Sequence, residues 1–219
     1  MSDEPLYAHY LSQIDEEKRR EHPAYKEVMA SQPMDWREVA NALTGPIPNG
    51  KSVWYQKHMA HHLTPGMDWD WIGKLTNCFL IRDPEAMITS FIRVIDNPTP
   101  VDLGLPQQVE LYEWIKSETG TTPIVIDSKD VLMNPGGMLA KLCERCGVGF
   151  DESMLSWEPG TREEDGVWAP HWYSSVYEST GFSPYKEKNE KVPERLAGVL
   201  EECNRYYQQL AQYKVSLES

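Results

Sequence analysis

Short apolar runs alternate along the chain with longer segments of helical periodicity. Two of the runs, 78–81 (CFLI) and 122–127 (TPIVID), are almost continuous, which is typical of strands buried on both faces of a parallel sheet. A third candidate strand covers 52–58 (SVWYQKH). Strands that are separated by helices predict an α/β fold, with a parallel sheet flanked by helices.

Helix signals lie between these strands. Asp35 and Glu38 form a capping pattern that predicts a helix over 34–45. Asp83 and Pro84 predict another helix start directly after the strand at 78–81, because proline suits the first helical position. Further helices are predicted over 105–120, over 134–147 and from about Pro193 onward.

The whole chain has 219 residues, of which 40% are hydrophobic, so it can bury one sizeable core. Neither a Pro/Gly/Ser-rich linker nor a change in composition divides it, and we expect a single domain over 1–219.

The net charge of -13 argues against nucleic acid and anionic membranes as partners. No apolar run approaches the roughly 20 residues of a membrane span, and we expect a cytoplasmic protein with reduced cysteines.

In such an acidic chain, the few cations near predicted strand ends are informative. Arg82 stands where the strand at 78–81 turns into a helix, and a helix N-terminus adds free N–H groups and positive potential there. Ser90 lies two helical turns from Asp83 on roughly the same face. The pattern predicts an anion site, with phosphate as the candidate. The alternative is that Arg82 pairs with a neighbouring carboxylate and Ser90 is an ordinary helix residue.

A second candidate lies at 55–63 (YQKHMAHHL), where a strand end presents Lys57, His58, His61 and His62. The histidines lack the glutamate of a HExxH pattern, so we predict no metal site. A lysine and a histidine at a strand end fit transfer to or from an anion better. The alternative is a polar turn with exposed histidines.

The segment 161–182 is rich in aromatic residues and glycine. Trp168, Trp172 and Tyr173 could line a pocket and Arg162 could offer another cation, although core packing of the rings explains them equally well.

One pair of cysteines, Cys143 and Cys146, has CxxC spacing on a predicted helix. There is no second such pair in the sequence. Packing of the two side chains in an apolar core is therefore favoured over a metal or redox site.

Four stretches, QKHMAHHL, FLIRDPEAMITSF, DGVWAPHWY and STGF, resemble the bacterial and plant sulfotransferase-like proteins of the P-loop superfamily. These are relatives of enzymes that use 3'-phosphoadenosine 5'-phosphosulfate (PAPS). The resemblance covers nearly the whole chain, including DEPLYAHYL near its start. It implies a three-layer fold, in which a parallel β-sheet is flanked by helices.

The resemblance also implies roles for individual residues. Arg82 and Ser90 match the positions that hold the 3'-phosphate of the cofactor. Arg162 matches a basic residue in a loop that closes over the same phosphate, although Glu163 and Glu164 stand beside it.

Near the reacting groups, Lys57 matches the lysine beside the transferred sulfuryl group. His58 or His61 is the counterpart of the family's histidine, because the spacing differs here. Glu4 matches a glutamate that serves as general base in other branches. The base is therefore Glu4 or one of the two histidines, and no metal is required.

One family feature has no counterpart in this sequence. The family begins with a strand, a glycine- and serine-containing phosphate loop and a helix, and such a loop does not occur among these 219 residues. We therefore expect a domain that is N-terminally incomplete, lacking its first strand.

Two functions are therefore considered. The protein transfers a sulfuryl group from PAPS to a hydroxyl or amine of a small molecule, or it is an inactive relative that binds a nucleotide or a protein.

Overall fold

The computed structural model describes residues 1–187 and 189–217, which fall into two units. Unit 1 comprises residues 1–75 and 160–178, and unit 2 comprises residues 76–159 and 179–219. The chain passes from one unit to the other at 75/76, 159/160 and 178/179. The single domain over 1–219 stays a prediction.

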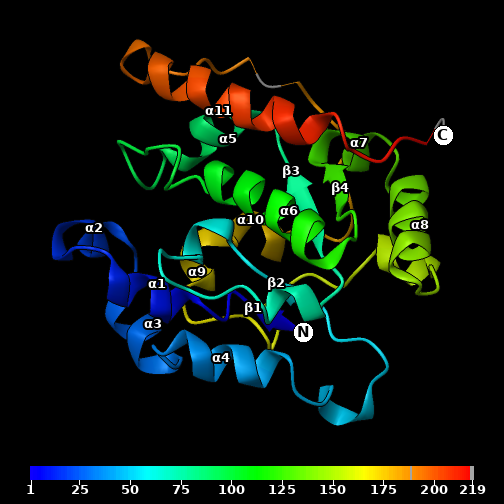
Figure 1. The fold of residues 1–219 in the computed structure, drawn as a ribbon. Helices are drawn as coiled ribbons and strands as arrows, with labels where there is room; N and C mark the ends of the chain where they lie inside the picture. The colour runs from blue at the N-terminus through cyan, green and yellow to red at the C-terminus, as the bar shows by residue number, and fades with distance from the viewer. Residues whose placement is uncertain (188, 218–219) are drawn as a thin grey trace. The chain divides into compact units, whose positions relative to one another are not determined.

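Unit 1 is mostly helical and holds one short pair of parallel strands (Figure 1). The strands are β1 (Ser2–Asp3) and β2 (Gln56–Lys57), paired Ser2 with Gln56 and Asp3 with Lys57. The helices are α1 (Tyr7–Gln13), α2 (Glu16–Glu21), α3 (Tyr25–Ser31), α4 (Trp36–Leu43), α9 (Ala169–Trp172) and α10 (Ser174–Tyr177). Short 3₁₀ turns cover Pro48–Gly50, Ala60–His62 and Ile72–Lys74.

Two expectations can be compared with unit 1. The helix predicted over 34–45 is α4, and Asp35 caps it by accepting a hydrogen bond of 2.9 Å from the backbone N–H of Arg37. The strand predicted over 52–58 is shorter, since only Gln56 and Lys57 pair with β1. The ladder ends there because β1 itself has two residues.

The core of unit 1 joins segments that are far apart in sequence. It consists of Tyr7, Ala8, Tyr10, Leu11, Val28 and Trp168. Trp168 is 2% exposed and fills the space beside Gly166, where a Cβ atom would lie only 2.0 Å from the indole ring. Glycine is therefore required at position 166 so that the ring can reach the core.

Unit 2 contains a second pair of parallel strands and the longer helices. The strands are β3 (Cys78–Ile81) and β4 (Ile124–Asp127), in a register that pairs Cys78 with Ile124 and Ile81 with Asp127. The helices are α5 (Pro84–Phe91), α6 (Leu105–Thr119), α7 (Ser128–Met133), α8 (Pro135–Cys146) and α11 (Ala197–Ala211), with 3₁₀ turns at Glu152–Leu155 and Glu194–Leu196. In Figure 1, α11 lies alongside α5 and α6; it also contacts both strands, and α8 packs on β4.

The helix starts predicted at Asp83 and Asn134 are confirmed, whereas the helix predicted from about Pro193 begins with the 3₁₀ turn Glu194–Leu196 and is α-helical from Ala197. Asp83 accepts a 2.8 Å hydrogen bond from the N–H of Ala86, and Pro84 is the first residue of α5. Asn134 caps α8 through the N–H of Gly137 at 3.0 Å. Gly147, with φ of +68°, ends α8 in the left-handed conformation that glycine adopts without steric cost.

The two strands of unit 2 differ in burial. All four residues of β4 are buried, as predicted for a strand covered on both faces. The same prediction is wrong for β3, because Cys78 and Leu80 are exposed while Phe79 and Ile81 are buried. Within the described residues β3 pairs with β4 alone, so it is an edge strand; the exposure of Cys78 and Leu80 shows separately that one of its faces is not covered by another layer.

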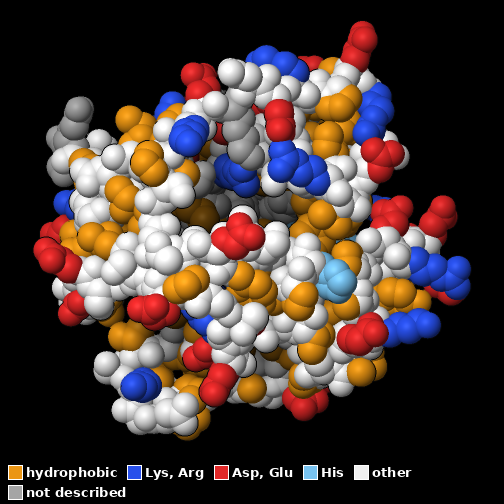
Figure 2. Space-filling view, turned by 180° about the vertical axis from the view of Figure 1, so that it is seen from behind, with side chains coloured by type: hydrophobic (Ala, Val, Ile, Leu, Met, Phe, Trp, Pro, Cys, Tyr) orange, Lys and Arg blue, Asp and Glu red, His pale blue; other side chains and the backbone are white. Residues whose placement is uncertain are grey.

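The α/β class is confirmed, with two parallel pairs of strands among helices. The larger three-layer sheet stays a prediction. No helix in the described part of the chain is long and apolar enough to cross a membrane. On the face drawn in Figure 2, acidic side chains are scattered among lysines and arginines rather than gathered in one patch.

Candidate functional site

Lys57 lies at the centre of a cluster of polar side chains in unit 1. Its ammonium group donates to Glu4 Oε1 at 2.5 Å, to Tyr173 Oη at 2.6 Å and to Asp3 Oδ1 at 3.2 Å. The Tyr173 hydroxyl in turn donates to Asp3 Oδ2 at 2.9 Å. Two carboxyl groups and a phenol therefore share one cation.

The backbone of unit 1 explains why these groups meet. Asp3 and Lys57 are direct partners in the β1–β2 ladder, and the N–H of Glu4 donates to the carbonyl of Lys57 at 2.9 Å. Glu4 has a φ of +42°, which non-glycine residues seldom adopt. Such a conformation costs of order 1 kcal/mol and is concentrated at functional sites. Tyr173 joins from the junction of α9 and α10.

Burial and charge shift the pKa values of this cluster. Asp3 is 6% exposed and Glu4 is 8% exposed. Burial raises the pKa of Glu4, and the ammonium of Lys57 offsets part of that shift. Burial alone would lower the pKa of Lys57, but the charge and hydrogen bond of Glu4 raise it above its ordinary value. The pKa of Tyr173 is raised by burial and by the charge of Glu4.

The hydrogen bonds around Lys57 limit what it can do. An ammonium group has three N–H donors, and the three acceptors given above use all of them. Glu4 is different, because its Oε2 atom makes no hydrogen bond with the described residues. Glu4 therefore keeps an oxygen that can accept a proton from a bound molecule.

The histidines after β2 are packed among aromatic rings, so the exposed polar turn considered above is not observed. His62 is 1% exposed and stacks between Tyr7 and Tyr10, with ring centroids 4.8 and 5.0 Å away. Burial holds its pKa well below the ordinary value. His61 meets Tyr10 edge-on at 5.1 Å.

His58 is the remaining candidate in this segment. Its Nε2 lies 3.3 Å from Gln56 Oε1, and burial lowers its pKa to about 4. It is therefore neutral at physiological pH and a weak base. In the described part of the chain, no group of three or more His, Cys, Asp or Glu side chains is arranged to hold a metal ion.

The second candidate position lies in unit 2, directly after β3. Arg82 is half-buried, and its guanidinium makes neither a hydrogen bond nor an ion pair with the described residues. Burial lowers its pKa, with the charge of Asp83 opposing this shift. Ser90 in α5 is also half-buried, and its hydroxyl likewise has no hydrogen-bond partner among the described residues. The alternative in which Arg82 pairs with a neighbouring carboxylate is not observed.

The hydrogen bonds of Asp127 explain why this nearby carboxylate does not pair with Arg82. Asp127 ends β4 in register with Ile81, so it lies at the same edge of the strand pair as Arg82. Its buried carboxylate accepts a 2.5 Å hydrogen bond from Tyr207 Oη and a 2.8 Å bond from the N–H of Lys129. Asp127 is thus satisfied by other donors, which leaves the charge of Arg82 available for an external anion.

The aromatic residues of segment 161–182, expected either to line a pocket or to pack in the core, are found in both kinds of place. Trp168 is core, as described above, while Tyr173 belongs to the Lys57 cluster. Arg162 is exposed on a turn closed by its own N–H, which donates to Asp165 Oδ2 at 2.8 Å. Its assignment to a phosphate loop stays a prediction.

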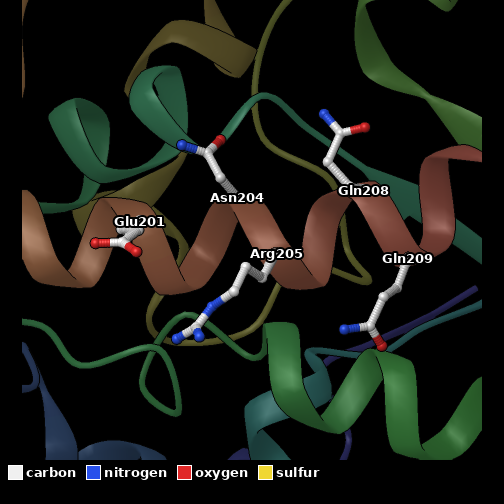
Figure 3. Close-up of a pocket in the computed structure, with 5 residues that line it drawn as sticks. All are labelled: Glu201, Asn204, Arg205, Gln208 and Gln209. Carbon is white, nitrogen blue, oxygen red and sulfur yellow. The ribbon is translucent and has the colours of Figure 1, made fainter.

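One polar surface elsewhere is drawn in Figure 3. It runs along the outer side of α11 and is formed by Glu201, Asn204, Arg205, Gln208 and Gln209. Asn204 and Gln208 extend to one side of the helix, whereas Arg205 and Gln209 extend to the other. Because these side chains do not converge on one point, we place no site there.

The comparison with known proteins bears on both candidate positions. The family model described as "Sulfotransferase domain" matches residues 1–208. The chain belongs to the sulfotransferase domain family. Similar curated proteins from Arabidopsis thaliana are named "Branched-chain-amino-acid aminotransferase-like protein 1" and "protein 2".

The first of these relatives is 34% identical over 192 residues, which cover 87% of this chain and 33% of the relative. The second is 30% identical over 206 residues, or 94% of this chain and 35% of the relative. This sulfotransferase domain therefore spans about a third of the length of these relatives. No solved structure matches it.

Within the sulfotransferase domain, the structure brings Glu4 and Lys57 into direct contact, and neither the Arg82 guanidinium nor the Ser90 hydroxyl has a hydrogen-bond partner in the described part of the chain. Sequence reasoning missed Asp3 as a ligand of Lys57. Alternation along a strand would direct the adjacent Asp3 and Glu4 to opposite faces. In the structure both contact Lys57, with Glu4 at a φ of +42°, so the sequence pattern contained no signal for this contact. The pair Asp127 and Tyr207 was also missed, since 80 residues separate its members.

Proposed function

We propose that this sulfotransferase domain transfers a sulfuryl group from PAPS to a hydroxyl or amine of a small molecule, as part of a three-layer fold. The observation that carries the proposal is Arg82, a half-buried guanidinium at the turn from β3 into α5 that has no partner among the described residues. A partly desolvated cation of this kind is stabilised when a ligand supplies an anion.

The residues near Arg82 fit one end of this cofactor. The fork of N–H groups on Arg82 suits a phosphate, and the Ser90 hydroxyl can donate to the same group. We therefore propose that Arg82 and Ser90 hold the 3'-phosphate, with Arg162 as a third candidate. The cofactor, when bound, supplies the activated sulfuryl group.

The residues of unit 1 suit the handling of the acceptor proton. Glu4 Oε2 takes the proton from the hydroxyl or amine as the acceptor atom becomes bonded to sulfur. Lys57 and Tyr173 hold Oε1 of the same carboxylate, which fixes its direction. His58 and His61 remain alternatives, but the pKa of about 4 makes His58 a weaker base than a carboxylate whose pKa is raised.

Binding of 3'-phosphoadenosine 5'-phosphate, followed by titration calorimetry, tests the assignment of Arg82. Arg82→Ala should weaken binding by roughly 10- to 100-fold, because charge-assisted hydrogen bonds are lost. Arg93→Ala is the matched control, since Arg93 pairs on the surface with Glu190 at 2.7 Å and its loss should change affinity by less than about threefold. Equal affinities in wild type and Arg82→Ala would overturn the phosphate site.

A second function, an inactive domain that binds a nucleotide or a protein, is favoured by a different observation. All three donors of Lys57 are engaged within the protein, so none is free for a sulfuryl oxygen. In this case 3'-phosphoadenosine 5'-phosphate should bind through Arg82, but no transfer should follow.

Transfer from ³⁵S-labelled PAPS to a panel of small phenols and primary amines separates the two functions. For an active domain, Glu4→Gln should lower the rate by roughly 10²- to 10⁴-fold, the usual contribution of a general base. Asp3→Asn is the matched control, because it also removes a carboxylate from Lys57 while keeping the proposed base. Its rate should stay within about tenfold of wild type. Binding without any transfer by wild type would support the inactive domain.

A further inference from the structure

Two cysteines from distant parts of unit 2 lie next to each other. Cys78 begins β3 and Cys146 ends α8, and their Sγ atoms are 3.6 Å apart. A disulfide needs about 2.05 Å between sulfur atoms, so a shift of roughly 1.5 Å would bring them to bonding distance. Both side chains sit at the end of an element, where such a shift disturbs few backbone hydrogen bonds.

The pairing differs from the one that the CxxC spacing suggests. Cys143 is 7% exposed and directs its thiol toward the sulfur of Met154 at 3.9 Å, so it fills the core as expected. Cys203 is fully buried. Cys78 is exposed and Cys146 is partly exposed, so reagents in solution can reach this pair and not the other two cysteines.

We propose that Cys78 and Cys146 are a redox modification site, which closes to a disulfide by exchange with a low-molecular-weight disulfide such as oxidised glutathione. The Cys146 thiolate attacks one sulfur of the small disulfide and releases a first small thiol. Cys78 then loses its proton to solvent, attacks Cys146 Sγ and releases the second small thiol. Two protein thiols are oxidised and one small disulfide is reduced.

The environment of Cys78 sets the order of these steps. Although the Cys78 side chain reaches solvent, its thiol is partly desolvated, and this desolvation together with the adjacent Cys146 raises its pKa to about 12. The thiolate is the reactive form, so deprotonation of Cys78 is unfavourable and its attack is placed in the second step. The second step is intramolecular between neighbouring sulfur atoms, which compensates for the small thiolate fraction of Cys78.

The link would close a loop across most of unit 2. The two cysteines are 68 residues apart, and the enclosed segment contains α5, α6, β4 and α7. A loop of this length removes much conformational freedom from the unfolded chain. The melting temperature of the oxidised protein should therefore rise by roughly 5–15 °C, and this increase should vanish after reduction.

The experiment uses the full chain, incubated with increasing ratios of oxidised to reduced glutathione and then alkylated. After alkylation, the oxidised protein should carry two alkyl groups fewer than the reduced protein and should weigh roughly 2 Da less than a chain with two free thiols in their place, because two hydrogens are lost, and non-reducing peptide mapping should join the peptides that carry Cys78 and Cys146. The control variant Cys143→Ser/Cys203→Ser should form the same link. Cys146→Ser should form no intramolecular link.

Three results would overturn the proposal: a link between Cys143 and Cys146, disulfide-linked dimers in place of the internal link, or free thiols at every ratio in a chain that remains folded by circular dichroism. Dithiothreitol should restore the original mass and melting temperature if the modification is reversible.

Discussion

Replacing Lys57 with methionine is expected to lower the free energy of unfolding by about 2–4 kcal/mol, less than the cost of breaking a fully buried ion pair because the Lys57 side chain is 34% exposed. Asp3 and Glu4 are both less than a tenth exposed, and Lys57 is the cation that contacts them. Methionine fills similar space without charge, so the loss comes mainly from two carboxylates left without a counterion. Urea unfolding at pH 7 measures the change.

A matched substitution distinguishes the loss of the Lys57 ion pairs from the general effect of replacing a lysine with methionine. Lys51→Met changes an exposed lysine six residues earlier and should alter stability by less than about 0.5 kcal/mol. Adding Glu4→Gln to Lys57→Met should restore part of the loss, because one uncompensated carboxylate disappears. If Lys57→Met were as stable as Lys51→Met, the buried cluster would not exist in solution.

Acid should destabilise unit 1 through its buried histidines. His58 and His62 have pKa values held below the ordinary 6.5 by burial, to about 4 for His58. The unfolded chain therefore binds more protons than the folded chain between pH 6.5 and 4. Stability contributed by these neutral histidines is complete above pH 6.5 and is lost as the pH falls, with a slope of up to about 1.4 kcal/mol per pH unit for each histidine.

The variant His58→Gln isolates this contribution from the general effect of acid on carboxylates. It should lose less stability than wild type between pH 6.5 and 4, as followed by urea unfolding at each pH. His171→Gln is the control, because His171 is exposed and should keep the wild-type pH dependence. If the curves of stability against pH for wild type and His58→Gln were parallel, the assignment of this effect to His58 would be contradicted.

Glu4 acts in the opposite direction, since its raised pKa contributes stability in acid that is lost as the pH rises.

Features set by neighbouring residues were predicted from the sequence. Asp35, Asp83 and Asn134 each accept a hydrogen bond from an N–H two or three residues ahead, so their capping role is encoded locally. The position of Arg82 follows in the same way, because strand and helix signals meet there. These interactions need no knowledge of the rest of the fold.

Features that depend on distant segments were predicted poorly. The contact of Tyr173 with Asp3 spans 170 residues, and no pattern along the chain links them. The exposed face of β3 was missed for a related reason. Its run of four apolar residues is the same as that of a strand buried on both faces, and only the packing of other elements on each face distinguishes the two.

Unit 1 is built from two segments that are far apart in the chain, so it cannot be completed until the second segment has been synthesised. Residues 1–75 leave the ribosome long before residues 160–178, which supply Trp168 to the core and Tyr173 to Lys57. At 5–20 residues per second, roughly 10–35 s separate the synthesis of Asp3 from that of Tyr173. During that interval the first segment exposes the apolar side chains of α1 and α3, which makes the nascent chain a candidate client for chaperones that act during translation.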